Sequence, residues 1–288
     1  MGGEFANALA NDLTAAVAGE SMARALQTRW LIDAAQMCQI GGRDSNQDAL
    51  DSLHNEGLHC FLVADGAGGH KGGEIAAAVA IKAISTAFAA DSAFSVEKLS
   101  AYLNAASQSV ARAQDSDQQL REMSTTVVSL LIDTQRGAAL WAHLGDSRIY
   151  FFRQQRIQAM SQDHSLVQQY IDAGYCGAEQ SRIHPHRHVL IAAIGAETDY
   201  TPCISTMQEL AAGDAFLLCS DGLWEWVLED EMEQALTQAS SAQDWLSRMQ
   251  GIADHRANQG QSTSVRDNTT AFAIWIDQMP QSPNSKAQ

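Results

Sequence analysis

Aspartates recur in this chain where apolar, strand-like runs end or where the sequence turns through glycine. Asp65 follows the apolar run 58–64 and begins Asp65-Gly66-Ala67-Gly68-Gly69-His70. Four more stand in comparable places, namely Asp48, Asp146, Asp221 and Asp267. Carboxylates on rigid strand ends, beside a glycine that lets a backbone carbonyl approach closely, suit hard cations such as Mg²⁺ or Mn²⁺. A single Asp-Gly pair indicates only a turn, but five such motifs in one chain favour a metal site.

The elements that must position these aspartates are short strands in adjacent runs, with helices between the runs. The apolar patterns predict strands at 58–64, 125–132, 138–144, 149–152, 157–160, 215–219 and 270–276. They predict helices over 74–88, 99–110, 165–173 and from 242 onward, with Ser95 and Ser241 as N-caps. Residues 153–156 suit a hairpin link, although they lack the Asn-Gly pair typical of one. Adjacent strands without strict alternation favour an α+β fold, with antiparallel sheets covered by helices.

Composition narrows the classes of partner. The 288 residues suffice for one large core, although two small domains remain open. Asp and Glu number 34 against 18 Lys and Arg, a formal net charge of -16. This balance argues against nucleic acid as the main partner, because phosphate backbones are bound by clustered basic residues. An acidic, solvated surface explains most of the excess, whether or not some carboxylates bind cations.

The cysteines are odd in number, widely spaced and without a CxxC pattern: Cys38, Cys60, Cys176, Cys203 and Cys219. Cys60 and Cys219 lie in strand-like runs, which predicts reduced core residues and a cytoplasmic protein. The best candidate for a membrane span, residues 75–90, is interrupted by Lys82, so we expect no span.

The two ends of the chain differ in character from the rest. Residues 1–29 are rich in alanine and predict a loose helical extension without a secretory signal, and residues 1–5 suggest a cloning scar. Residues 278–288 form a polar tail with two prolines, which predicts disorder. Between these ends, residues 30–277 are interpreted as the folded part of the chain.

The ordered motifs resemble one family. Its matching text comprises Gly41-Gly42-Arg43 through Asn46-Gln47-Asp48, Val63-Ala64-Asp65-Gly66 with Gly68-Gly69-His70, Thr125-Thr126-Val127-Val128, Leu144-Gly145-Asp146-Ser147-Arg148, Asp163-His164-Ser165, Ser220-Asp221-Gly222-Leu223-Trp224, and Asp267-Asn268-Thr269-Thr270. This set is similar to the protein phosphatase 2C-like, metal-dependent (PPM) family in its bacterial serine/threonine form. The resemblance implies two stacked antiparallel β-sheets flanked by α-helices, with a flap at about residues 165–203.

The resemblance also implies a role for each matching residue. Asp65 would bridge two Mn²⁺ or Mg²⁺ ions, Asp221 and Asp267 would complete one coordination shell, and Asp48 with the Gly66 carbonyl would complete the other. Asp146 would help Asp221 hold a weaker third ion. Arg43 would bind the substrate phosphate, to which a planar guanidinium is suited. His70 would protonate the leaving serine or threonine oxygen.

Structural alternatives accompany several of these roles. Asp146 could instead be a turn residue, and His70 a histidine that packs within a loop. Arg43 could instead form a surface ion pair. Thr125 and Thr126 are interpreted as strand residues, and Trp224 and Trp226 as core residues. Within the flap, His184, His186 and His188 suit a surface loop better than a zinc site, because their spacing lacks cysteine or acidic partners.

The predicted activity is hydrolysis of phosphoserine and phosphothreonine in proteins by a water that two cations activate. We expect a monomeric enzyme that opposes a bacterial Ser/Thr kinase. Two rivals remain: a silent phosphatase-like scaffold, which would usually lack metal aspartates, and a hydrolase of small phosphoesters. Two positions depart from the family pattern. Ser124 stands where the family usually has glycine before the threonine pair, and Ala192-Ala193 stand in the flap where polar residues are common. The second departure leaves the substrate preference open.

Overall fold

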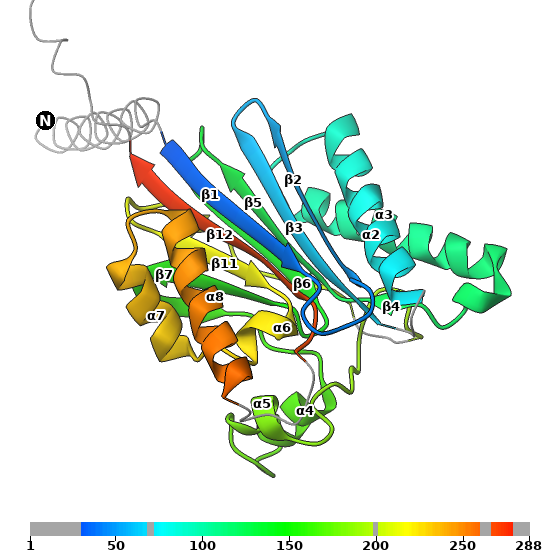
Figure 1. Cartoon of the computed structure of the whole chain (residues 1–288). Coiled ribbons are helices and arrows are strands. Elements are labelled where there is room, and N and C mark those ends of the chain that lie inside the picture. The colour runs from blue at the N-terminus through cyan, green and yellow to red at the C-terminus, as the bar shows by residue number, and fades with distance from the viewer. Residues whose placement is uncertain (1–29, 68–71, 198–200, 260–265, 279–288) are drawn as a thin grey trace, which may run out of the picture.

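Two antiparallel sheets lie face to face at the centre of the molecule (Figure 1). The computed structural model describes residues 30–67, 72–197, 201–259 and 266–278. The first sheet has five strands, in the order β1 (Trp30–Gln39), β12 (Thr269–Gln278), β11 (Ala215–Cys219), β7 (Arg148–Arg153) and β8 (Arg156–Met160). Every pairing within it is antiparallel.

The second sheet has seven strands. Its main path runs through β10 (Gln208–Glu209), β6 (Ala138–Leu144), β5 (Val127–Asp133), β3 (Leu58–Ala67) and β2 (Asp48–Asn55). Two short strands join from the side: β4 (Ser124–Thr125) pairs with β3, and β9 (Cys203–Ile204) pairs with β6. Between the two sheets lies an apolar cluster that includes Phe61, Phe216 and Phe272.

Helices cover the outer face of each sheet (Figure 1). The second sheet carries α2 (Gly72–Ala90) and α3 (Val96–Ser116), followed by a 3₁₀ turn, η1 (Gln118–Leu120). The first sheet carries α6 (Asp221–Trp224), α7 (Glu229–Gln238) and α8 (Ala242–Asn258). Two short helices, α4 (Leu166–Asp172) and α5 (Gln180–Ile183), belong to the otherwise irregular flap. The predicted fold class, an α+β sandwich of two antiparallel sheets flanked by helices, is confirmed.

Local chemistry explains where several elements begin and turn. Ser95 accepts a hydrogen bond from the Lys98 amide, and Ser241 accepts one from the Asp244 amide, so both predicted N-caps are confirmed. The hairpin between β7 and β8 turns through Gln154 and Gln155, whose φ angles are 53° and 61°. Two positive φ angles match the twist of a tight hairpin, so this turn forms without the glycine that the sequence lacks.

Helix α2 is the one described helix long and apolar enough to cross a membrane by length and composition. Its residues Ala80, Ile84 and Phe88 are buried in the core cluster shared with β3 and α3. A buried core helix meets the same criteria of length and hydropathy. The predicted extension at 1–29, the cloning scar at 1–5 and the tail beyond Gln278 lie outside the described residues.

Candidate active site

The first two aspartates meet across neighbouring strands. Asp48 and Asp65 are direct partners in the antiparallel register of β2 and β3. Thr126 Oγ1 accepts a hydrogen bond from the Asp65 amide (3.0 Å), and Thr125 Oγ1 donates to the Asp65 carbonyl (2.8 Å). Both threonines are buried. They hold the backbone of Asp65 in place, as strand residues.

Gly66 lets the beginning of α2 lie against the end of β3. A Cβ atom at Gly66 would lie 2.1 Å from the Gly73 carbonyl oxygen, a distance that no side chain tolerates. A Cβ atom at Gly73 would lie 2.6 Å from the Gly66 carbonyl oxygen. The two glycines therefore permit a backbone-to-backbone contact beside Asp65.

Asp221 joins this pair from the other sheet. It begins α6, with one residue between it and the end of β11. The preceding residue, Ser220, donates its hydroxyl to Asp48 Oδ2 over 2.8 Å. Oδ1 of Asp48 and Oδ1 of Asp221 are both buried and have no hydrogen-bond partner among the described residues. Since buried carboxylate oxygens normally have partners, these two atoms suit an electropositive ligand.

Asp267 and Arg43 form the rim of the cluster. The Arg43 guanidinium donates to the Asp267 carboxylate, and the Arg43 side chain is half-exposed. Next to Asp267, the side chain of Asn268 accepts from the Gln47 amide (2.8 Å) and donates to the carbonyls of Ile40 (2.8 Å) and Ser45 (3.0 Å). Asn268 thus ties the loop that carries Arg43 to the start of β12. The ion pair expected as an alternative for Arg43 exists, and its partner is a site residue.

Asp146 is held from beneath by a buried aromatic residue. The Trp224 indole Nε1 donates to the Asp146 carbonyl over 2.9 Å, so this predicted core residue also positions the site. The guanidinium of Arg148 lies 3.5 Å from the centre of the Trp224 ring and makes two hydrogen bonds to Asp163, of 2.8 and 2.7 Å. The sequence motifs contain Arg148 and Asp163, but the patterns gave no reason to pair them.

The carboxylates repel one another strongly. Burial raises the pKa of Asp48 to about 7, and the neighbouring Asp221 and Asp267 add to the shift. The pKa of Asp65 is raised well above its usual range, mainly by burial and then by the charges of the other site aspartates. The pKa of Asp146 is also raised well above its usual range, mainly by burial and then by Asp221. All five predicted aspartates are therefore close enough to interact. Divalent cations would offset this repulsion, so the residues present fit the metals that the sequence predicts.

The flap approaches the cluster through one histidine. His188 Nδ1 lies 3.7 Å from Asp221 Oδ2 and 3.8 Å from Glu225 Oε1. Arg187 donates to Glu225 over 2.8 Å. Glu225 was not predicted as a site residue, although it follows the motif of Asp221 by one helical turn. Its pKa is raised to about 7 by burial and by Asp221. His184 and His186 lie against each other, with ring centroids 5.5 Å apart, whereas His188 joins the acidic site.

Two further predictions concern His70 and the alanines of the flap. His70, the predicted acid, lies outside the described residues. Ala192 and Ala193 are buried rather than presented to a substrate, and Ile194 forms a backbone bridge with Thr125. The alanines at this departure from the family pattern thus belong to the base of the flap, where it joins the second sheet.

Comparisons with known proteins agree with this geometry. A family model described as "Protein phosphatase 2C" matches residues 39–268. The "Serine/threonine phosphatase stp" of Listeria monocytogenes is 31% identical over 239 residues, which cover 81% of this chain and 90% of that protein.

Two solved structures share the fold. The crystal structure of the Mycobacterium tuberculosis serine/threonine phosphatase PstP/Ppp has a TM-score of 0.72 and 28% identity, over 85% of this chain and 99% of that one. The catalytic domain of the serine threonine protein phosphatase PstP in complex with two manganese ions has a TM-score of 0.72 and 25% identity, over 86% and 99% of the two chains. Because the family model spans most of the sequence, the chain belongs to the protein phosphatase 2C family, as its motifs predict.

Proposed function

We propose that this protein hydrolyses phosphoserine and phosphothreonine in other proteins with the help of two divalent cations, Mn²⁺ or Mg²⁺. The observation that carries the proposal is the gathering of five aspartates from both sheets around two buried carboxylate oxygens, Asp48 Oδ1 and Asp221 Oδ1, that lack partners among the described residues. The manganese complex of a related phosphatase supports the choice of metal.

The residues that would hold the two ions are Asp48, Asp65, the Gly66 carbonyl, Asp221 and Asp267, with Asp146 contributing to a weaker third position. When bound, such ions lower the pKa of water and withdraw charge from a phosphoryl group. The carboxylates fit this task because their repulsion disfavours the metal-free arrangement. Asp48 begins β2, Asp65 lies near the end of β3 and Asp221 begins α6, so regular elements hold three of the carboxylates.

Arg43 would bind the phosphoryl oxygens. Its guanidinium lies beside Asp267 at the half-exposed rim of the cluster, where an incoming phosphoprotein can reach it. A guanidinium can turn one edge to a carboxylate and still offer donors to a phosphate. His70 would donate a proton to the leaving serine or threonine oxygen, because an alkoxide leaves poorly without one.

One experiment separates this activity from its two rivals. Phosphoserine and phosphothreonine peptides and a panel of nucleotides are incubated with the protein, with Mn²⁺, with Mg²⁺ and after exhaustive chelation. Turnover of peptides in the presence of either metal supports the proposal. Selective turnover of nucleotides would identify a small-phosphoester hydrolase, and tight phosphopeptide binding without turnover would identify a scaffold.

The cellular setting completes the proposal. A phosphatase of this class would oppose a Ser/Thr kinase, acting on the kinase or on its substrates in the cytoplasm as a monomer. The net charge of -16 supports protein rather than nucleic-acid partners.

A further inference from the structure

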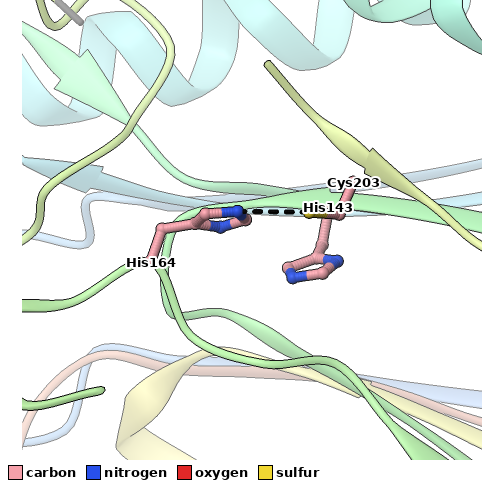
Figure 2. A group of neighbouring side chains, drawn as sticks. All are labelled: His143, His164 and Cys203. Atoms are coloured by element: carbon pink, nitrogen blue, oxygen red, sulfur yellow. Dashed lines mark hydrogen bonds between the residues drawn. The ribbon is translucent and has the colours of Figure 1, made fainter. Parts of the chain in front are cut away.

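Two histidines and a cysteine, none of them part of the acidic cluster, lie close together (Figure 2). His143 lies in β6, Cys203 begins β9, and the antiparallel register makes them direct partners. His164 comes from the segment between β8 and α4. Three separate elements therefore contribute one metal-ligating side chain each, and none of the three residues has a role in the proposed phosphatase chemistry.

The spacing of their ligand atoms suits a small cation. One ligand atom from each residue lies within 4.8 Å of the other two, and Cys203 Sγ is 3.4 Å from His164 Nε2. Tetrahedral Zn²⁺ with ordinary bond lengths places sulfur and nitrogen ligands about 3.6 Å apart. The cysteine–histidine distance already approaches this value, and the ligand atom of His143 lies within 4.8 Å of the other two.

Backbone groups orient both imidazole rings. His143 Nε2 lies 2.8 Å from the Gln162 carbonyl oxygen, and when Nε2–H donates to it, Nδ1 carries the lone pair. His164 Nδ1 lies 3.2 Å from the Gly145 amide nitrogen, from which it can accept, and 3.3 Å from the Gly145 carbonyl oxygen, to which it can donate. The tautomer that donates to the carbonyl leaves the Nε2 lone pair facing Cys203, and metal binding would select this tautomer. A carbonyl behind each ring is the usual support of a metal-bound histidine.

The surroundings keep the imidazoles neutral and the site accessible. Burial lowers the pKa of His143 to about 4, and burial also lowers the pKa of His164. Neutral imidazole is the form that binds metals. Cys203 is exposed, and it lines a pocket of about 440 Å³ together with His164, Gln168 and Asp172. The pocket leaves room for water as a fourth ligand.

We propose that His143, His164 and Cys203 bind Zn²⁺ and thereby fasten the end of the flap to the turn before Asp146. A thiolate with two imidazoles favours Zn²⁺ over the Mg²⁺ and Mn²⁺ that carboxylates prefer. Cys203 lies where the flap returns to the second sheet, and His164 contacts Gly145, the residue next to Asp146. The ion would connect these two segments.

Cobalt substitution tests the site directly. The chelated full-length protein is saturated with Mg²⁺ to occupy the carboxylates and then titrated with Co²⁺. One equivalent of Co²⁺ should produce thiolate-to-cobalt charge-transfer absorption and tetrahedral d–d bands, which Zn²⁺ should abolish by displacement. Cys203→Ser should remove the charge-transfer band, and His143→Gln or His164→Gln should weaken Co²⁺ and Zn²⁺ binding at least tenfold.

Matched controls come from the same flap. Cys176→Ser and the exposed His186→Gln should leave the spectra and the affinities unchanged. Zn²⁺ should also slow modification of Cys203 by a thiol reagent, as measured by mass spectrometry. The proposal is overturned if the wild-type protein gives no charge-transfer band, if Cys203→Ser retains it, or if Zn²⁺ leaves the rate of Cys203 modification unchanged.

Discussion

Asp48 and Asp65 face each other across β2 and β3 as direct register partners, and the hydroxyl of Ser220 from the opposite sheet donates to Asp48. The Asp48–Asp65 pair is thus set by strand pairing within the second sheet, and the contact with the first sheet is set by the side chain of Ser220. This arrangement brings two like charges together at a buried strand end, which is unfavourable without a counter-ion.

Substitution of the core aspartates should reduce activity more than substitution of Asp146. We expect Asp65→Asn or Asp221→Asn to lower kcat/KM on a phosphopeptide by about a hundredfold or more, since each would remove a ligand from the two-ion site. Asp146→Asn should cost less, because it serves the weaker position. The exposed Asp115→Asn is the control. Equal losses for all three site variants would contradict the assignment.

The metal-free protein should lose stability as the pH rises. The folded-state pKa of Asp48 is about 7, against an ordinary value of 3.8. Between these values the unfolded chain releases its proton and the folded protein retains it, so unfolding becomes easier as the pH increases. The shift corresponds to a free-energy cost on the order of 4 kcal/mol at high pH.

Asp48→Asn should remove that part of the pH dependence. In urea titrations with a chelator present, the variant should be more stable than the wild type at pH well above 7 and similar to it near pH 4. Mn²⁺ should stabilise the wild type more than the variant. If the unfolding free energies of the two proteins changed with pH in parallel, Asp48 would not be the source of the stability loss at high pH.

Two buried tryptophans allow a matched comparison. Trp224 donates to the Asp146 carbonyl (2.9 Å), whereas Trp245 donates to the Met232 carbonyl (3.1 Å) away from the site. Each Trp→Phe change should cost about 1–3 kcal/mol of unfolding free energy, because a buried carbonyl loses its donor. Only Trp224→Phe should also raise the Mn²⁺ concentration needed for half-maximal activity. The same metal dependence in both variants would indicate that Trp224 only packs.

The role of the flap in substrate recognition is best tested at its exposed residues. Arg187 is paired with Glu225, and His188 lies beside Asp221, so replacing them should affect turnover of every substrate. Tyr175 and Ile183 are exposed flap residues, at 82% and 67%. Their alanine variants should change the ranking of phosphopeptides and leave para-nitrophenyl phosphate turnover within about twofold, since loops of this kind carry specificity. An unchanged ranking would argue against a flap role in recognition.

Substrates with different leaving groups test whether His70 acts as the general acid. If His70 donates the proton, His70→Gln should reduce hydrolysis of an alkyl phosphate more than that of para-nitrophenyl phosphate, because para-nitrophenolate leaves without help. General acid catalysis is typically worth about 10²–10⁴-fold, which sets the expected size of the alkyl effect. Single-turnover rates for both substrates give the comparison. Proportional losses on the two would rule out this role.

The sequence by itself determined the class of the protein and the types of its site residues. An apolar run that ends in Asp and Gly can be recognised from a few consecutive residues, because the patterns that predict strands and turns are equally short. The strands 138–144 and 215–219 were predicted with the bounds that β6 and β11 have in the structure. The N-caps Ser95 and Ser241 could also be predicted from the sequence, because an N-cap side chain accepts a hydrogen bond from an amide only three residues away.

Only the tertiary structure decided which of these residues meet. The Ser220–Asp48 hydrogen bond, the Trp224–Asp146 hydrogen bond and the Arg148–Asp163 pair each join residues from separate elements. The register of β9 on β6, which places Cys203 opposite His143, is likewise a long-range pairing. Such contacts depend on how two sheets stack and on which backbone groups remain to be satisfied, and no periodicity within one segment carries that information.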